Sequence, residues 1–231
     1  MDDDALMVLR ANALFTYDER GRMTWTNEPD RRPAPRVFLG CTATGCVARF
    51  GASLADAPAR RLTDVIARWP LAGEATISEG LRAAIHESLA AEAPVAHESG
   101  GPVYRFPVSI ALPGDAIEIT PETIALVRET FPWLYDDLAV WRPCFAVVVD
   151  GAARSVCFTS RIGVAAMEAG VFTLPDYRGL HLAVTTTAAW GASIQERNFV
   201  PLYSTDWTNH ASQAVARRAG LIMFGADATW R

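Results

Sequence analysis

The chain has 231 residues, of which 50% are hydrophobic and 20% charged, and its net charge is −5. This composition is typical of a folded domain with a buried core and excludes a disordered chain. The acidic balance argues against nucleic acid as a partner, and apolar runs no longer than a strand, such as residues 144–149, argue against a membrane span. Because Met1 is followed by three aspartates, unlike the basic start of a signal peptide, we expect a cytoplasmic protein.

In the first part of the chain, helices and strands follow one another at short intervals. Apolar residues at Leu62, Val65, Ile66 and Trp69 recur every three or four positions, which is typical of one helical face, and Pro58 suits the first turn. We expect helices over residues 4–15, 56–69 and 78–92, and strands over 23–26, 37–41 and 46–50. Turn-forming residues then cluster over 93–102, so we place a boundary between an N-terminal α/β region, 1–98, and a domain over 99–231.

Two features of the N-terminal region predict no site. Arg31, Arg32 and Arg36 lie among prolines and indicate a solvated loop rather than a phosphate site. Cys41 and Cys46 are not followed by a second pair with zinc-binding spacing, so we expect no metal. In a chain without a secretion signal, all four cysteines, including Cys144 and Cys157, are expected to be free thiols.

The second part alternates strands and helices in a different order. A strand is expected over 103–110, and Thr120-Pro121-Glu122 predicts a helix start whose apolar face continues until Pro132 interrupts it. Strands are expected over 144–149, 154–161 and 164–174, the first two joined by a hairpin turn at Asp150-Gly151. A helix within 178–197, a strand over 200–205, a helix over 209–219 and a strand over 221–224 complete an α/β fold with a mixed sheet.

The segment over residues 168–183 carries the clearest chemical signal. An apolar strand runs into a tight loop, and the loop runs directly into a helix. Unpaired backbone N–H groups and the positive end of the helix dipole then point to one place, which makes an anion site that suits a pyrophosphate. Gly179 permits close approach of the backbone, and Arg178 adds a charged donor.

This segment resembles the acyl-CoA motif of the GNAT superfamily of N-acyltransferases, in which a strand leads into P-x-Y-R-G-x-G-x-A and a helix. The matching residues are Pro175, Tyr177, Arg178, Gly179 and Ala183, whereas His181 replaces the second glycine and Asp176 a position often occupied by glutamine or arginine. The next strand and helix also resemble the superfamily, through Asn209, Ser212 and Gly220. The two blocks lie in the expected order within residues 146–224 and are more specific together than either alone.

The resemblance implies acyl-CoA, in the simplest case acetyl-CoA, as co-substrate, without a metal. It would lie where the strands over 168–174 and 201–205 separate, with backbone amides of Phe172, Thr173 and Leu174 holding the thioester carbonyl. The loop and helix start would bind the diphosphate through Arg178, Gly179, Leu180, His181, Leu182 and Ala183. Asn209 and Ser212 would cap the last helix and contact the cofactor.

The resemblance also implies roles in proton transfer. An amine acceptor must lose a proton before it attacks, and Glu168 is the candidate base; the alternative is a surface or salt-bridged glutamate. The thiolate of CoA has a pKa of about 8.5, so it needs little help from an acid. Tyr203 is the candidate acid, because Ala216 occupies the position where relatives often carry a tyrosine. For His181 the alternatives are a functional residue and a loop residue without a catalytic role.

Three hypotheses follow. The chain is an N-acyltransferase that moves an acyl group from acyl-CoA to a primary amine, on a small molecule or a peptide, within a ternary complex. Alternatively it binds CoA with little catalysis, since Asp176, His181 and Ala216 depart from the motif. In the third hypothesis residues 1–98 form an interaction module that sets oligomerisation, for instance a homodimer, or docks a protein. The sequence leaves the acceptor and the acyl length open.

Overall fold

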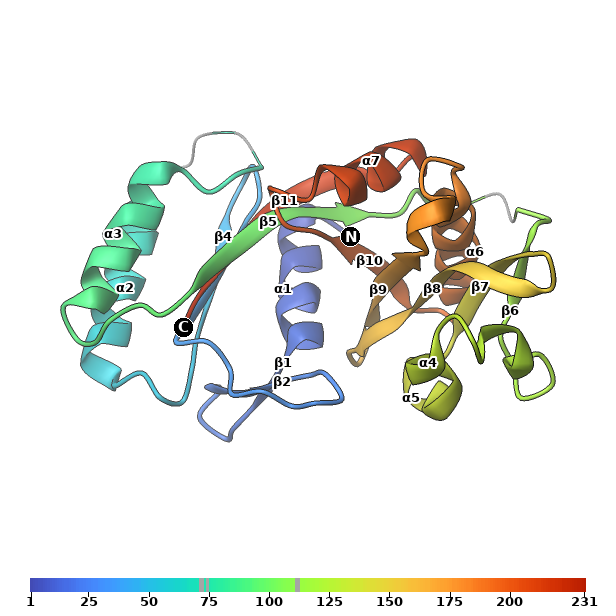
Figure 1. Cartoon of the computed structure of the whole chain (residues 1–231). Helices are drawn as coiled ribbons and strands as arrows, with labels where there is room; N and C mark the ends of the chain where they lie inside the picture. Colours follow the sequence, from blue (N-terminus) through green and yellow to red (C-terminus); the bar gives the residue numbers. More distant parts are fainter. Residues whose placement is uncertain (71–72, 74, 111–112) are drawn as a thin grey trace. The chain divides into compact units, whose positions relative to one another are not determined.

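The computed structural model describes residues 1–70, 73, 75–110 and 113–231 (Figure 1). The chain forms two compact units. The first comprises Met1–Val103, Ser204–Thr208 and Met223–Arg231, and the second comprises Tyr104–Tyr203 and Asn209–Ile222. The first unit therefore includes two segments from the C-terminal part of the chain. A single boundary in the sequence does not divide the chain into these two units.

The first unit is built on four neighbouring strands in the order β4-β3-β11-β5. Strand β3 is antiparallel to both β4 and β11. A separate antiparallel pair, β1 and β2, follows the first helix. The elements are α1 (Asp3–Leu14), β1 (Phe15–Tyr17), β2 (Met23–Thr26), β3 (Val37–Cys41), β4 (Cys46–Phe50), α2 (Asp56–Arg68), α3 (Glu79–Ala90), β5 (Glu98–Arg105) and β11 (Ile222–Trp230).

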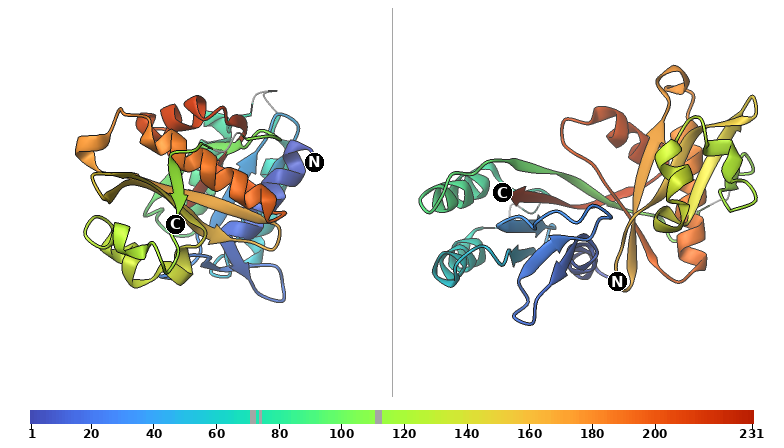
Figure 2. Two further views of the ribbon diagram at one scale, coloured as in Figure 1. Left: turned by 90° about the vertical axis from the view of Figure 1, so that its right-hand side faces the viewer. Right: turned by 60° about the horizontal axis from the view of Figure 1, so that its bottom comes forward.

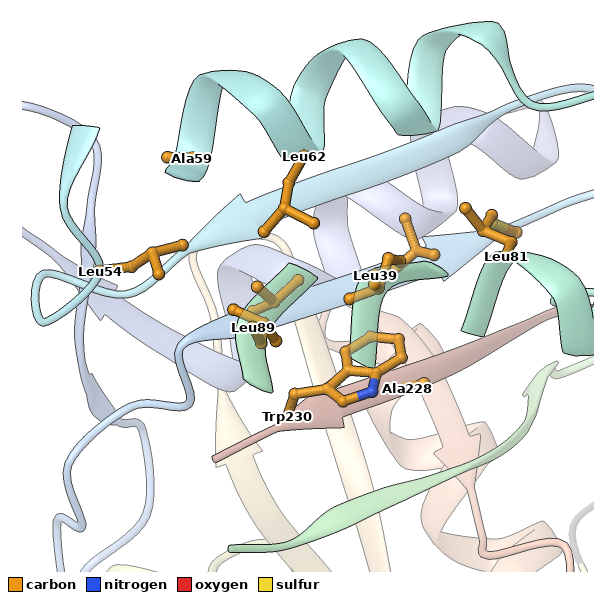
Figure 3. Packing of buried hydrophobic residues seen from close by; sticks show 11 residues of the cluster. Leu39, Leu54, Ala59, Leu62, Leu81, Leu89, Ala228 and Trp230 are labelled. Atoms are coloured by element: carbon orange, nitrogen blue, oxygen red, sulfur yellow. The ribbon is translucent and has the colours of Figure 1, made fainter. Parts of the chain in front are cut away.

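Helices pack on both faces of these strands. On one face, Leu62 of α2 and Leu89 of α3 lie in a fully buried cluster with Leu39 and Trp230 (Figure 3). On the other face, α1 places Met7 against β3, where a Cβ on Gly40 would lie 2.3 Å from the Met7 sulfur. Neighbouring residues of a strand point to opposite faces of the sheet. Leu39 therefore faces α2 and α3, and Gly40 faces α1.

The three helices and three strands expected in residues 1–92 are confirmed within a residue or two. The strand expected over 103–110 is wrong at both ends, because β5 spans Glu98–Arg105. Gly100 and Gly101, which resemble turn residues, lie inside β5: a Cβ on Gly100 would be 2.3 Å from the carbonyl oxygen of Asp227, and one on Gly101 1.8 Å from that of Thr205. These glycines therefore permit close backbone approach within a strand.

The expectation of four free thiols is also wrong in part. Cys41 and Cys46 are register partners at the end of the β3–β4 hairpin, and they form a disulfide. The hairpin register brings the two sulfur atoms together, a relation that their spacing alone does not reveal. Cys144 and Cys157 are free and buried, and burial raises the pKa of both thiols.

The second unit contains a mixed sheet in the order β10-β9-β8-β7-β6. Strand β10 is parallel to β9, and the other neighbours are antiparallel, so the α/β class predicted from the sequence is confirmed. The elements are β6 (Ala116–Glu118), the 3₁₀ helix η1 (Ile124–Val127), α4 (Pro132–Asp136), α5 (Leu138–Trp141), β7 (Cys144–Val149), β8 (Ala152–Ile162), β9 (Ala166–Thr173), the 3₁₀ helix η2 (Pro175–Tyr177), α6 (Leu182–Glu196), β10 (Val200–Ser204) and α7 (His210–Arg218).

The sheet of the second unit has two distinct faces (Figure 2, left). On one face, the indole nitrogen of Trp190 in α6 donates to the Thr159 hydroxyl of β8, at 3.1 Å. On the other face, Phe158, the preceding residue of β8, is buried in a cluster with Leu134 of α4 and Leu138 of α5. Alternation along the strands therefore decides which residues face α6 and which face α4 and α5.

One helix boundary differs from the prediction. The helix expected from residue 120 is a turn followed by the short η1, and Pro132 begins α4 instead of ending a helix. Proline fits this position because the first residue of a helix has no intrahelical partner for its N–H. The sequence analysis also did not predict the short strands β1 and β6.

Candidate functional site

The loop between β9 and α6 is anchored to the sheet over its first half. The amide of Leu174 donates to the carbonyl oxygen of Arg154 in β8, at 3.0 Å, and the amide of Tyr177 donates to Leu174, at 3.0 Å. The guanidinium of Arg154 lies over the Tyr177 ring, 4.9 Å from its centroid. The Arg178 amide donates to Pro175, at 3.2 Å. These contacts fix the direction in which the chain leaves the sheet.

The second half of the loop presents backbone donors without acceptors. Among the described residues, no hydrogen-bond acceptor is found for the amides of residues 179–183. The next amides, of Val184 and Thr185, donate to the carbonyl oxygen of His181, at 3.0 and 3.2 Å, and so begin α6. The open amides therefore lie at the positive end of a helix of 15 residues, an arrangement that binds anions.

Two residues of this loop adopt left-handed backbone geometry. Gly179 has φ +80° and His181 has φ +62°. His181 thus adopts the backbone geometry that glycine provides most easily at the second motif position. Its side chain makes no cap hydrogen bond to α6, and the residue is exposed. Arg178 is also exposed, and it has no acidic partner within the part of the chain that the structure describes.

Strands β9 and β10 pair over a short distance only. Their parallel register runs from Val200↔Ala166 to Leu202↔Glu168, and in the described chain no pair between them is found beyond Glu168. On its other edge β9 pairs with β8 as far as Thr173. The strands therefore separate where the sequence analysis expected a cofactor cleft, and the backbone of β9 beyond Glu168 lacks a partner on the β10 side.

The hydrogen-bond register identifies which β9 amides face that side. The Leu174 amide is already bonded to Arg154 of β8, and Phe172↔Val156 continues the same register. Because antiparallel strands alternate the direction of their N–H groups, Val171 and Thr173 point their amides away from β8. The amides of Phe172 and Leu174 therefore face β8, contrary to the expectation for both, whereas the amides of Thr173 and of Val171, which the sequence analysis did not single out, face the side away from β8.

Glu168 is buried and forms a salt bridge, which was one of the two alternatives considered for it. Its side chain is 2% exposed, and its carboxylate pairs with the Arg161 guanidinium at 3.1 Å. Arg161 lies opposite Glu168 because a bulge shifts the β8–β9 register between Thr159 and Arg161. Within this bulge the Ser160 hydroxyl donates to the carbonyl oxygen of Glu168, at 3.0 Å. The carboxylate is therefore buried, held in position by a cation, and located at the last β9–β10 pair.

Tyr203, Ser212 and Asn209 form a connected group at the start of α7. The Asn209 side chain accepts from the Ser212 amide at 3.0 Å, so the predicted cap is confirmed. The hydroxyls of Tyr203 and Ser212 lie 2.7 Å apart. Burial of Tyr203 is the main cause that raises its pKa to about 12, while the Ser212 hydrogen bond lowers it. Ala216 is fully buried.

An aromatic cluster, not predicted from the sequence, lies on the same sheet face as Glu168. It consists of Trp133 from α4, Trp141 from α5, Phe158 from β8 and Phe172 from β9, and we call it the aromatic face. The density of aromatic residues over 131–141 was visible in the sequence. Their shared location was not, because it depends on how α4 and α5 pack on the sheet. Among the described residues, no group of three His, Cys, Asp or Glu side chains is arranged to hold a metal ion.

Solved structures share this fold. An acetyltransferase of the GNAT family from Colwellia psychrerythraea is 12% identical over 99% of this chain and 95% of that one, with a TM-score of 0.51. A GCN5-related N-acetyltransferase from Kribbella flavida is 13% identical over 98% and 93%, with a TM-score of 0.50. A GCN5-related N-acetyltransferase-like protein from Streptococcus suis 89/1591 is 16% identical over 67% and 69%, with a TM-score of 0.46.

The first two likenesses extend over nearly the whole chain, so the protein has a GNAT-like fold, as the sequence motifs indicated. No protein-family model and no curated protein matches the sequence. No helix in the described ranges has both the length and the apolar composition needed to span a membrane.

Proposed function

We propose that this protein transfers an acyl group, in the simplest case acetyl, from acyl-CoA to a primary amine by direct attack within a ternary complex. One observation carries the proposal: the amides of residues 179–183 have no acceptor in the described chain, and they follow a strand that loses its β10 partner beyond Glu168. An anion site next to an open strand edge suits a cofactor with a diphosphate at one end and an amide-containing arm at the other.

The cofactor would bind in two parts. Its diphosphate would accept hydrogen bonds from the open amides between Gly179 and Ala183, and Arg178 would add a charge-assisted contact. Its pantetheine arm would lie along the unpaired edge of β9 and replace part of the missing strand pairing. The amides of Val171 and Thr173 would be its donors there, because the register points both away from β8.

The same amides would support the chemical step. When the amine attacks the thioester carbon, negative charge develops on the carbonyl oxygen, and a fixed N–H donor stabilises it. The thiolate of CoA then leaves with the bonding electrons. We assign Tyr203 a structural contact with Ser212 and no acid role, because a phenol with a pKa of about 12 is a poor proton donor to a thiolate.

Glu168 would remove the proton that the attacking amine must lose. It lies where β9 and β10 separate, at the end of the proposed pantetheine path. The Arg161 guanidinium pairs with the carboxylate, and an ionised carboxylate accepts a proton directly or through a water molecule. The pair also holds the carboxylate in one orientation, which a proton acceptor needs.

The proposal is tested by binding and turnover of the purified protein. We expect acetyl-CoA to bind at micromolar concentration and free thiol to appear when a primary amine is added. Glu168→Gln keeps the size and a hydrogen bond to Arg161, so it should lower kcat by about a hundredfold or more and change the Kd for acetyl-CoA little. The matched control is Glu196→Gln, at the exposed end of α6, which should leave both constants unchanged. An unchanged kcat in Glu168→Gln would remove Glu168 from the mechanism.

A second candidate is a CoA-binding protein with little catalysis. Two observations favour it: the base candidate is already paired with a guanidinium, and His181 replaces a motif glycine. Such a protein would bind acetyl-CoA tightly, release no thiol with a broad panel of amines, and respond to Glu168→Gln with no change in either measurement.

A further inference from the structure

The aromatic face is an ordered group of rings. Phe158 and Phe172, on neighbouring strands, stack with an interplanar angle of 3° and centroids 6.0 Å apart. Trp133 meets the edges of both rings, with centroids at 4.9 Å from Phe158 and 5.8 Å from Phe172. Trp141 lies 5.3 Å from both Trp133 and Phe158. These are favourable aromatic geometries, so the rings hold one another in fixed positions.

This face is not closed over by the rest of the second unit. Phe158 is buried, but Phe172 is 56% exposed, and Trp133 and Trp141 are each partly exposed. Rings that only completed the core would be buried like Phe158. The second unit thus leaves apolar ring surface accessible on the strand that we assign to the cofactor.

The aromatic face continues directly from Glu168. Phe158 is the register partner of Gly170, which lies two residues along β9 from Glu168 and therefore on the same sheet face. A Cβ on Gly170 would lie 2.4 Å from the Phe158 ring, so glycine is what allows this ring to lie flat on β9. Two strand residues span about 7 Å, so Glu168 precedes the position of Phe158 by about 7 Å along β9 and that of Phe172 by about 13 Å.

We propose that the aromatic face receives the apolar body of the acceptor, so that the acceptor is a primary amine with an aryl or bulky aliphatic group one or two carbons from the nitrogen. This inference rests on the proposed function and specifies its substrate class. The nitrogen is held near Glu168, and the apolar group lies against Phe172 and the two tryptophans. The polar groups of an amine with a polar body would lose their hydrogen bonds to water on contact with the rings. Such an amine would gain no binding free energy there.

The spacing between Glu168 and the rings sets the length of the acceptor. Phe172 lies four residues, or about 13 Å of strand, from Glu168, so an aryl or bulky aliphatic group one or two carbons from the nitrogen reaches from the carboxylate toward the near side of the aromatic face. The faces of the rings also attract a cation, so a protonated amine is favoured on its way to the carboxylate. Long polyamines and amino sugars carry polar groups where the rings require apolar surface, and they are expected to be poor acceptors.

The test compares 2-phenylethylamine with ethanolamine as acceptors at saturating acetyl-CoA. We expect kcat/KM to favour 2-phenylethylamine by roughly tenfold to a hundredfold, which is the usual gain from burying one ring. Phe172→Ala removes an exposed side chain and should leave the fold intact, while it lowers kcat/KM for 2-phenylethylamine about tenfold more than kcat/KM for ethanolamine. Trp141→Leu should have the same selective effect. Val108→Ala, at a residue that is 99% exposed and outside the aromatic face, should change neither.

The outcomes separate the inference from the function on which it rests. Equal use of both amines, or an unchanged preference in Phe172→Ala and Trp141→Leu, would overturn the inference while acyl transfer stands. Binding of acetyl-CoA without transfer to 2-phenylethylamine would overturn the inference, and binding without transfer to any of a broad panel of primary amines would overturn the transferase proposal itself.

Discussion

Two helices of the second unit follow a strand and a loop, and their N-termini are built differently. At α7, the Asn209 side chain accepts from the Ser212 amide, and the Ser212 hydroxyl contacts Tyr203. At α6, the cap position is His181 in left-handed geometry, without a side-chain hydrogen bond, and the amides of residues 179–183 have no acceptor in the described chain. One helix start is closed by the protein's own side chains, and the other is open.

The difference indicates what each end does. A helix start leaves several N–H groups without intrahelical partners, and a protein satisfies them with caps, water or a ligand. The capped end of α7 stabilises the fold and offers few donors. The open end of α6 lacks that stabilisation, and under the proposed function its donors are available to an anion. The following predictions test this contrast, from the largest expected effect to the smallest.

Gly179→Asp should have the largest effect. The substituted carboxylate repels the diphosphate at the open amides, so we expect the affinity for acetyl-CoA to fall about a hundredfold or more. Gly179→Asn is the matched control, since asparagine has nearly the same shape, tolerates positive φ and carries no charge. No neighbouring atom lies within 4 Å of a Cβ at this position, so neither variant meets a steric obstacle. Isothermal titration of both variants decides: equal affinities would contradict an anion site here.

Tyr203→Phe should lower stability and leave catalysis intact. It removes the hydroxyl that contacts Ser212, for a loss of about 1 to 2 kcal/mol in the free energy of unfolding. In the wild type, burial raises the pKa of Tyr203 to about 12, above the value of about 10 in an unfolded chain. This contribution to stability is therefore present below pH 10 and lost as the pH rises from 10 to 12.

Denaturant titrations at pH 8 and pH 11 would measure both effects, and the variant should lack the part of the alkaline loss that Tyr203 causes. Turnover measured from pH 6 to 9 should be the same in both proteins. A kcat that falls in the variant would restore Tyr203 as the acid.

Asn209→Ala should remove the cap of α7. We expect a loss of about 1 kcal/mol in the free energy of unfolding, because the Ser212 amide loses its acceptor. Asn209→Asp keeps a capping oxygen and should retain wild-type stability. Thermal unfolding of the two variants is the measurement; a similar loss in both would show that the cap is not the stabilising contact.

His181→Gly should change the free energy of unfolding least of these variants, and it should raise that free energy rather than lower it. Relief of the left-handed backbone at φ +62° favours the folded state, whereas the greater freedom of unfolded glycine opposes it. We expect the glycine variant to exceed His181→Ala in stability by about 1 kcal/mol, since alanine keeps the strain. Both should bind acetyl-CoA like the wild type, because the backbone amide is the donor. A large loss of affinity in both would assign a role to the imidazole.

Sequence reasoning located the open helix start at residues 179–183 because the relevant order is local. A strand, a tight loop with Gly179 and a helix in direct succession place consecutive amides together whatever the rest of the chain does. The cap at Asn209 is local in the same sense. Most helices and strands were also predictable, because Leu62, Leu81 and similar residues repeat with the period of one element.

Strand register was not predictable, and it decided several details of the site. The bulge in β8 places Arg161 opposite Glu168, and the β8–β9 register directs the Val171 amide outward while the Leu174 amide is used. The Cys41–Cys46 disulfide likewise depends on register, here that of the β3–β4 hairpin. Each of these relations joins residues on different strands, and no periodicity within one strand encodes it.

The sequence by itself therefore determined most of the helices and strands, the open helix start at residues 179–183 and the resemblance to GNAT acyltransferases. Only the tertiary structure decided the partner of Glu168, the role of the glycines inside β5 and the location of the aromatic face. The physical reason is that backbone donors and helical faces follow from neighbouring residues, whereas contacts between strands and packed helices depend on segments far apart in the chain.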